Sequence, residues 1–118
     1  MTNIIYQGQP GGLPFSITYT PDSDATQTLM LAGSAYSGTK YLLIGIELVF
    51  DGNVVATSAV WTNESESHKA LSPGFGTVQF PLKFDDNGNI QPVTLTINPA
   101  FDGTVFDVND FLSVVLMG

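Results

Sequence analysis

The sequence predicts an all-β protein, an antiparallel β-sandwich of about eight strands, and three observations carry this prediction. Apolar and polar residues alternate along much of the chain, and β-branched residues are frequent in the alternating segments. No stretch shows a 3.6-residue apolar repeat with helix-capping residues at its ends. Turn-forming residues recur at short intervals between the apolar segments. The length of 118 residues fits a single domain, residues 1–118.

Turn signals separate the expected strands, taken in order along the chain. Strands are expected near residues 3–7, 14–20, 27–36, 40–50, 53–62, 76–83, 91–98 and 110–117. The breaks contain glycine, proline and aspartate, which cannot continue a strand ladder or which favour turns. Asp51-Gly52 and Asn87-Gly88 are the strongest hairpin signals among them. Short strands at such regular spacing are typical of a sandwich or jelly roll.

The hairpin over residues 40–62 predicts a register. A two-residue loop at Asp51-Gly52 pairs Phe50 with Asn53, and counting outward pairs Leu42 with Trp61. One face, expected in the core, holds Leu42, Ile44, Ile46, Leu48, Phe50, Val55, Ala59 and Trp61. The opposite face is also mostly apolar and holds Tyr41, Leu43, Gly45, Glu47, Val49, Val54, Ala56, Ser58, Val60 and Thr62.

The second apolar face of this hairpin has two explanations. Either another part of the same chain covers it, or a second subunit does. We favour an oligomer because a solvated face should alternate with polar residues, and because large exposed apolar patches are uncommon on monomers. Glu47 would then be a buried carboxylate that requires polar partners.

Four segments of the chain resemble the C1q/TNF-like jelly roll. They are residues 14–24, residues 28–32, residues 44–55 with their Asp51-Gly52 hairpin, and the closing apolar strand within residues 108–117. The Gly-x-Tyr segment of C1q-type domains is not matched, since residues 25–28 read Ala-Thr-Gln-Thr. The resemblance implies a compact homotrimer used for recognition or surface display, without catalysis.

Composition excludes several classes of function. The chain has three Lys, no Arg and eleven Asp or Glu, for a net charge of −8. This balance argues against nucleic-acid binding and against anionic membrane surfaces. Without cysteine there is no disulfide or thiol chemistry. No signal peptide or membrane-spanning segment is recognisable, so we expect a soluble chain, with a cell exterior or virion surface reached by another route left open.

The residues for catalysis are few, so an enzyme is not expected. His68 is the one histidine, and the sequence lacks a Gly-x-Ser-x-Gly elbow, a phosphate-cradling loop and a His-Glu-x-x-His pair. A lone histidine in a serine-rich loop is more often solvated or pins the loop. A role in ligand binding is the alternative.

The densest polar stretch, residues 61–69, is the candidate ligand site. Sugars are bound by polar side chains that hydrogen-bond hydroxyl groups, beside an aromatic ring that covers the apolar sugar face. The candidate ligand-binding residues are Trp61, Asn63, Glu64, Glu66 and His68. The alternative is an ordinary surface loop with Trp61 buried, as the register above places it.

Two acidic clusters are candidate calcium sites, since Ca²⁺ prefers oxygen ligands. One contains Asp107, Asn109 and Asp110, which are better explained as Asx turns that set up the last strand, and which could hold calcium if the fold combines them with the 62–68 loop. The other spans residues 85–89, where Asn87-Gly88 is better explained as a hairpin turn. No organic cofactor is expected.

These observations favour a non-catalytic, lectin-like recognition module. It would be a homo-oligomeric β-sandwich, preferably a trimer, that binds carbohydrate or another surface ligand. The alternative is a structural protein of a virion, spore or cell surface, with no small-molecule ligand.

Overall fold

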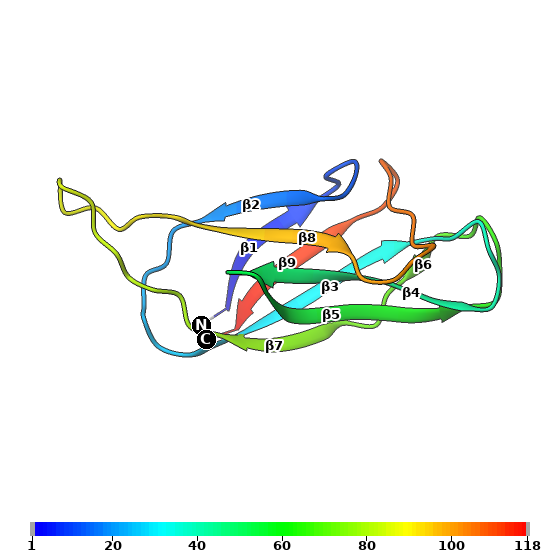
Figure 1. The fold of residues 1–118 in the computed structure, drawn as a ribbon, viewed down its shortest axis with the longest axis horizontal. Coiled ribbons are helices and arrows are strands. Elements are labelled where there is room, and N and C mark those ends of the chain that lie inside the picture. The colour runs from blue at the N-terminus through cyan, green and yellow to red at the C-terminus, as the bar shows by residue number, and fades with distance from the viewer. Residues whose placement is uncertain (1, 118) are drawn as a thin grey trace.

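The computed structural model describes residues 2–117, which form nine strands and no helix. Two antiparallel sheets pack face to face (Figure 1). The strands are β1 (Thr2–Gly8), β2 (Phe15–Tyr19), β3 (Gln27–Ala35), β4 (Leu42–Phe50), β5 (Asn53–Thr62), β6 (Lys69–Ala70), β7 (Gly74–Val78), β8 (Val93–Pro99) and β9 (Leu112–Met117). Within residues 2–117 there is consequently no helix of the length and apolarity that a membrane span requires.

The strand pairing is nested along the chain. One sheet has the order β1-β9-β3, with β6 and β7 both pairing with β3, and the other has the order β2-β8-β4-β5. β1 therefore pairs with β9, β2 with β8, β3 with β7 and β4 with β5, as in one long hairpin that has been rolled up. This arrangement is a jelly roll. The predicted antiparallel sandwich is confirmed.

The core lies between the two sheets and follows the period of two along each strand. Alternate side chains of β3 and β4 are fully buried, among them Leu29, Leu31, Ile44 and Ile46. Phe80, which follows β7, is also buried and closes one end of the core against aromatic rings of β2 and β4. Burying each such side chain contributes about 1.5–3 kcal/mol.

A β-bulge in the central hairpin corrects the predicted register. The turn forms as expected, with positive φ at Asp51 and Gly52 and with Phe50 opposite Asn53. Val55 is then an extra residue, so Leu48 pairs with Ala56 and every later partner shifts by one. A shift of one residue exchanges the two faces of a strand. The predicted faces are therefore right for β4 and wrong for β5 beyond the bulge.

This exchange changes the burial of several residues. Ala56, Ser58 and Thr62 are buried, whereas Trp61, expected in the core, is 59% exposed. In the single chain Glu47 is half-buried, opposite Thr57 and Asn98 on the neighbouring strands, and its burial by a second subunit stays a prediction. Among residues 2–117 no other segment covers this outer face as a whole, and Leu43 on it is 40% exposed.

One predicted strand, residues 76–83, is displaced. β7 covers Gly74–Val78 instead and ends before Pro81, which lacks the N–H that a ladder needs. Gly74 and Gly76 allow β7 to approach β5 closely, because a Cβ at either position would overlap the backbone carbonyl of Thr57 or Val55. The Ser72 N–H also donates to the Ala59 carbonyl at 3.0 Å, so the two sheets are joined along this side.

Candidate functional site

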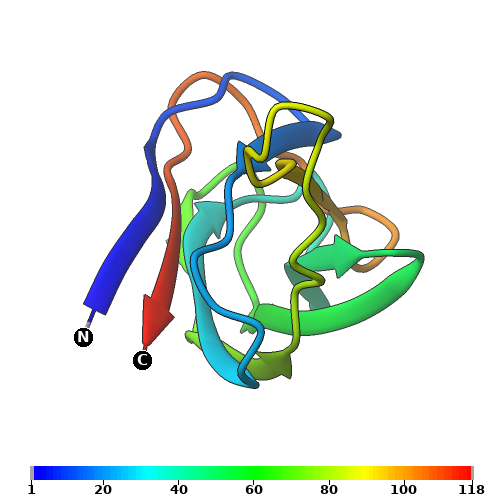
Figure 2. The same ribbon diagram turned by 90° about the vertical axis from the view of Figure 1, so that its left-hand side faces the viewer.

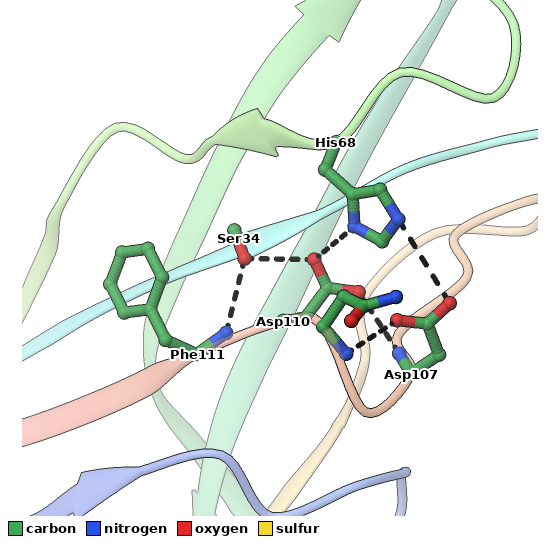
Figure 3. Close-up of polar contacts among 6 residues, drawn as sticks. Ser34, His68, Asp107, Asp110 and Phe111 are labelled. Atoms are coloured by element: carbon green, nitrogen blue, oxygen red, sulfur yellow. Dashed lines mark hydrogen bonds and ion pairs between the residues drawn. The ribbon is translucent and has the colours of Figure 1, made fainter.

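A buried carboxylate connects three segments at one end of the sandwich. Asp110 has no exposed surface, and its Oδ1 accepts a hydrogen bond from Ser34 Oγ at 2.8 Å and lies 2.7 Å from His68 Nδ1 (Figure 3). Its Oδ2 accepts the backbone N–H of Asp107 at 2.9 Å. Ser34 lies in β3, His68 in the loop after β5 and Asp107 in the loop before β9. Asp110 is thus fully hydrogen-bonded, as a buried carboxylate must be.

The Asp110 side chain is positioned by a compact turn. Asp107 Oδ1 accepts the N–H of Asn109 at 2.9 Å, which is the Asx turn expected from the sequence. The Asp110 N–H donates to the Asp107 carbonyl at 3.0 Å. Ser34 Oγ in turn accepts the N–H of Phe111 at 3.1 Å, so the hydroxyl group links β3 to the start of β9.

His68 lies between two carboxylates and an aromatic ring. Its Nε2 is 3.9 Å from Asp107 Oδ2, and its ring centroid is 4.3 Å from that of Tyr36. The hydrogen bond to Asp110 raises the pKa of His68, the charges of Asp107 and Glu66 act in the same direction, and partial burial opposes them. The pKa of Tyr36 is also raised. Partial burial is the largest cause, and the charges of Asp107 and Glu66 add to it. His68 therefore holds the loop after β5 against Asp110. Its neighbour Tyr36 was not predicted from the sequence.

The side chains around His68 have metal-ligand chemistry, and hydrogen bonds use part of it. One ligand atom from each of His68, Asp107 and Asp110 lies within 4.8 Å of the other two. Both oxygens of Asp110 accept hydrogen bonds, and Asn109 is exposed. Asp110 Oδ1 is contacted by Ser34 and His68, whereas Oδ2 accepts one hydrogen bond and retains a second lone pair. The calcium site at Asp107, Asn109 and Asp110 stays a prediction.

The second candidate calcium cluster, residues 85–89, forms a turn. Asp85 Oδ1 accepts the backbone N–H groups of Asn87 and Asn89, each at 2.9 Å. Gly88 has φ of 81°, the left-handed conformation that a tight turn requires. The hairpin-turn interpretation of this segment explains its geometry fully.

The predicted ligand-binding residues divide into two groups. His68 joins the acidic cluster, whereas Trp61 lies on the outer face of β5, directly opposite Leu43 of β4. The exposed Tyr41 precedes β4, and its N–H donates to the Thr62 carbonyl at 2.9 Å. We call Tyr41, Leu43 and Trp61 the aromatic platform. Sequence reasoning missed the first two as site residues, although their places beside the polar loop were a usable signal.

The polar residues beside the platform are exposed. They are Asn63, Glu64 and Glu66. Glu64 Oε1 accepts a hydrogen bond from Lys69 Nζ at 3.1 Å. The Glu66 N–H donates to the Ser37 carbonyl at 2.7 Å, which ties the middle of the loop to the segment after β3. Amide and carboxylate groups therefore lie in the loop that follows Trp61, and a backbone hydrogen bond ties the middle of this loop to the segment after β3.

Two grooves lie toward the other end of the sandwich. The larger, about 750 Å³, lies between the Asp51 turn and residues 79–83. The smaller, about 310 Å³, lies between Asn3 and residues 22–27. Neither groove is lined by a predicted ligand-binding residue, so those residues form an exposed surface outside both grooves.

Comparison with known proteins gives likenesses of fold only. No protein-family model and no curated protein matches the sequence. The C-terminal domain of EclA, described as a sugar-binding protein, is 13% identical over 99% of this chain and 77% of that chain, with a TM-score of 0.46. The VP2 subviral particle of infectious bursal disease virus is 16% identical over 98% of this chain and 31% of that chain, with a TM-score of 0.36.

Proposed function

We propose that the protein is a non-catalytic recognition module that binds carbohydrate on the aromatic platform and the adjoining loop. The observation that carries this proposal is the exposure of Trp61, which is 59% accessible although it lies within a strand. A large aromatic side chain exposed in this way loses the contribution that its burial would make to stability. Contact with a ligand would recover that contribution.

The chemistry around Trp61 suits a saccharide. The apolar face of a pyranose ring can stack on the indole, with Leu43 extending the apolar surface. Carboxylates at Glu64 and Glu66 accept hydrogen bonds from sugar hydroxyl groups, and the Asn63 amide both donates and accepts. Because the His68–Asp110 pair and the Glu66 N–H fix the loop, binding costs little further ordering of the backbone.

The proposed module acts as a homo-oligomer, with a trimer favoured. An exposed platform without a deep pocket gives weak affinity at a single site, and several copies on one assembly raise it through avidity. Under this proposal the whole chain is one C1q/TNF-like domain. It needs no cofactor and displays its platform at a cell or virion surface.

A glycan array and a calorimetric titration with the best array ligand test the proposal. We expect Trp61→Ala to weaken binding by at least about tenfold, because it removes the stacking surface. Phe84→Ala is the matched control, since Phe84 is 61% exposed on a distant loop, and it should bind like the wild type. Absence of binding across the array, or equal binding by Trp61→Ala and the wild type, would contradict carbohydrate recognition.

A structural role in an assembly is the second candidate. The observation that favours it is the scarcity of charge in both sheets, since Glu47 of β4 and Lys69 of β6 are the two charged residues within the strands. Stable higher-order assemblies in a protein that binds no glycan would support this function instead.

A further inference from the structure

The imidazole of His68 is oriented by two neighbours that leave its Nε2 atom free to act as a ligand. Its Nδ1 lies 2.7 Å from Oδ1 of Asp110, a carboxylate with no exposed surface (Figure 3). Because a carboxylate oxygen only accepts hydrogen bonds, the neutral ring carries its proton on Nδ1 and its lone pair on Nε2. The ring of Tyr36, in the segment after β3, packs against the imidazole with centroids 4.3 Å apart. These two contacts fix the direction of the Nε2 lone pair.

The Nε2 atom faces the carboxylate of Asp107. Nε2 is 3.9 Å from Asp107 Oδ2, which is beyond hydrogen-bond distance. The other oxygen, Oδ1, accepts the N–H of Asn109 at 2.9 Å and so holds the carboxylate in place. Two ligand atoms of a tetrahedral Zn²⁺ ion lie about 3.4 Å apart. A movement of about 0.5 Å reaches this separation, and both side chains can make it because they are 34% and 35% exposed.

We propose that His68 Nε2 and Asp107 Oδ2 bind a divalent transition-metal ion such as Zn²⁺, with Asp110 as the residue that positions the histidine. A histidine that binds a metal typically donates its other ring N–H to a carboxylate or a carbonyl group, and Asp110 supplies that carboxylate here. A nitrogen and an oxygen ligand suit Zn²⁺, whereas Ca²⁺ takes oxygen ligands. This site therefore differs from the predicted calcium site, in which Asp110 is a direct ligand and His68 is not.

The charges around His68 favour a cation at this position. The carboxylates that stabilise positive charge on the ring are Asp110, Asp107 and Glu66. The chain contains no arginine, and its Lys69, beside His68 in sequence, donates from Nζ to Glu64 Oε1 at 3.1 Å. A divalent ion between Nε2 and Asp107 would therefore reduce the repulsion among the carboxylates around the ring.

The metal site joins two loops and is separate from the aromatic platform. His68 ends the loop after β5, and Asp107 lies in the loop that leads into β9. Figure 2 shows β9 on the opposite side of the sandwich from the β4–β5 hairpin, whose outer face carries Trp61. A bound ion would cross-link the two loops and stabilise the folded chain, and carbohydrate recognition on the platform does not require it.

Calorimetric titration of the full chain with ZnCl₂ at about pH 8, where the imidazole is mostly neutral, tests this site. We expect one Zn²⁺ ion per chain with a dissociation constant of roughly 10 μM, as two protein ligands allow. His68→Gln and Asp107→Asn should each weaken binding by at least about tenfold, because each impairs one ligand. Asp86→Asn, at an exposed carboxylate in the other acidic cluster, is the matched control and should bind Zn²⁺ like the wild type.

Nitrogen NMR of the imidazole separates the positioning role of Asp110 from a merely structural one. In the wild type, Zn²⁺ should shift the Nε2 resonance while Nδ1 stays protonated. Asp110→Asn should weaken Zn²⁺ binding by about 10–100-fold and allow metal to reach either ring nitrogen. If circular dichroism shows that this variant does not fold, the nitrogen that shifts in the wild type decides the assignment.

Three results would overturn the inference. They are binding of Ca²⁺ but not Zn²⁺, equal Zn²⁺ binding by the wild type and a folded His68→Gln or Asp107→Asn variant, and a Zn²⁺-dependent shift of Nδ1 in place of Nε2. The glycan array is performed in EDTA, so its outcome does not depend on the metal. Failure of the metal site and failure of carbohydrate recognition therefore give different results.

Discussion

At the scale of single residues, Asp110 determines the local structure around the candidate site. One buried carboxylate makes hydrogen bonds with a hydroxyl group, an imidazole and a backbone N–H from three different segments of the chain. The sequence showed Asp107 and Asp110 as an Asx turn but gave no sign that Ser34 lies beside them. Such a contact depends on the packing of β3 against β9, which no local pattern records.

Asp110→Ala should lower the free energy of unfolding by about 3 kcal/mol, because it leaves the partners of a buried, charged hydrogen-bond acceptor unsatisfied. Urea denaturation measures this change. Asp86→Ala, at an exposed position on a loop, should change stability by less than about 0.5 kcal/mol. Similar losses for the two variants would show that Asp110 does not have this structural role.

The raised pKa of His68 predicts a pH dependence of stability. Asp110 favours protonated His68 in the folded state, so the folded pKa lies above the ordinary value of about 6.5. The stability from this pair is fully present below the unfolded pKa and is lost as the pH rises through the folded pKa. His68→Gln should remove this component of the unfolding free energy measured from pH 5 to 8. A histidine titration by NMR with a midpoint below 6.5 would contradict it.

At the scale of the elements, the bulge at Val55 shows where prediction succeeded and where it failed. The Asp51-Gly52 turn and the strands on either side follow from turn chemistry and alternation. The faces of β5 could not be predicted, because both alternating sets of side chains contain small and apolar residues and no local signal marks the bulge. The exposure of Trp61 thus depends on one extra residue in the ladder.

The close approach of β7 to β5 gives a prediction for Gly76. Gly76→Ala should destabilise the fold by about 2 kcal/mol, since a Cβ would overlap the backbone carbonyl of Val55 and the strands would have to separate. Gly12→Ala is the control because no atom lies within 4 Å of its added Cβ. Thermal unfolding compares the two variants. An unchanged melting temperature for Gly76→Ala would mean that the strands can separate at little cost.

At the scale of the whole molecule, charge and apolar surface are divided between loops and sheets. The sandwich was predictable because alternation and turn residues are local signals that sum over the chain. The strand order was not, because it depends on how strands that are distant in sequence pair within each sheet. Low overall charge was visible from the composition, but the structure was needed to show that only Glu47 and Lys69 among the charged residues lie in strands.

The proposed homo-oligomer should respond to salt in a defined direction. Raising the ionic strength from about 0.05 to 0.5 M screens the repulsion between acidic loops, so self-association should become tighter. Sedimentation at several concentrations measures the dissociation constant at each salt level. Weaker association at high salt would show that ion pairs, rather than an apolar face, hold the copies together.

The side of the sandwich where β5 is hydrogen-bonded to the segment before β7 is protected from uncontrolled aggregation. Strand edges with free N–H and C=O groups can recruit further chains, but β5 and the segment before β7 are bonded to each other through Ala59 and Ser72. On the other side, β1 has a bulge between Ile4 and Tyr6, and β2 is a short strand between Pro14 and Pro21. Both features discourage strand addition, so the proposed homo-oligomer can stay finite instead of growing into fibres.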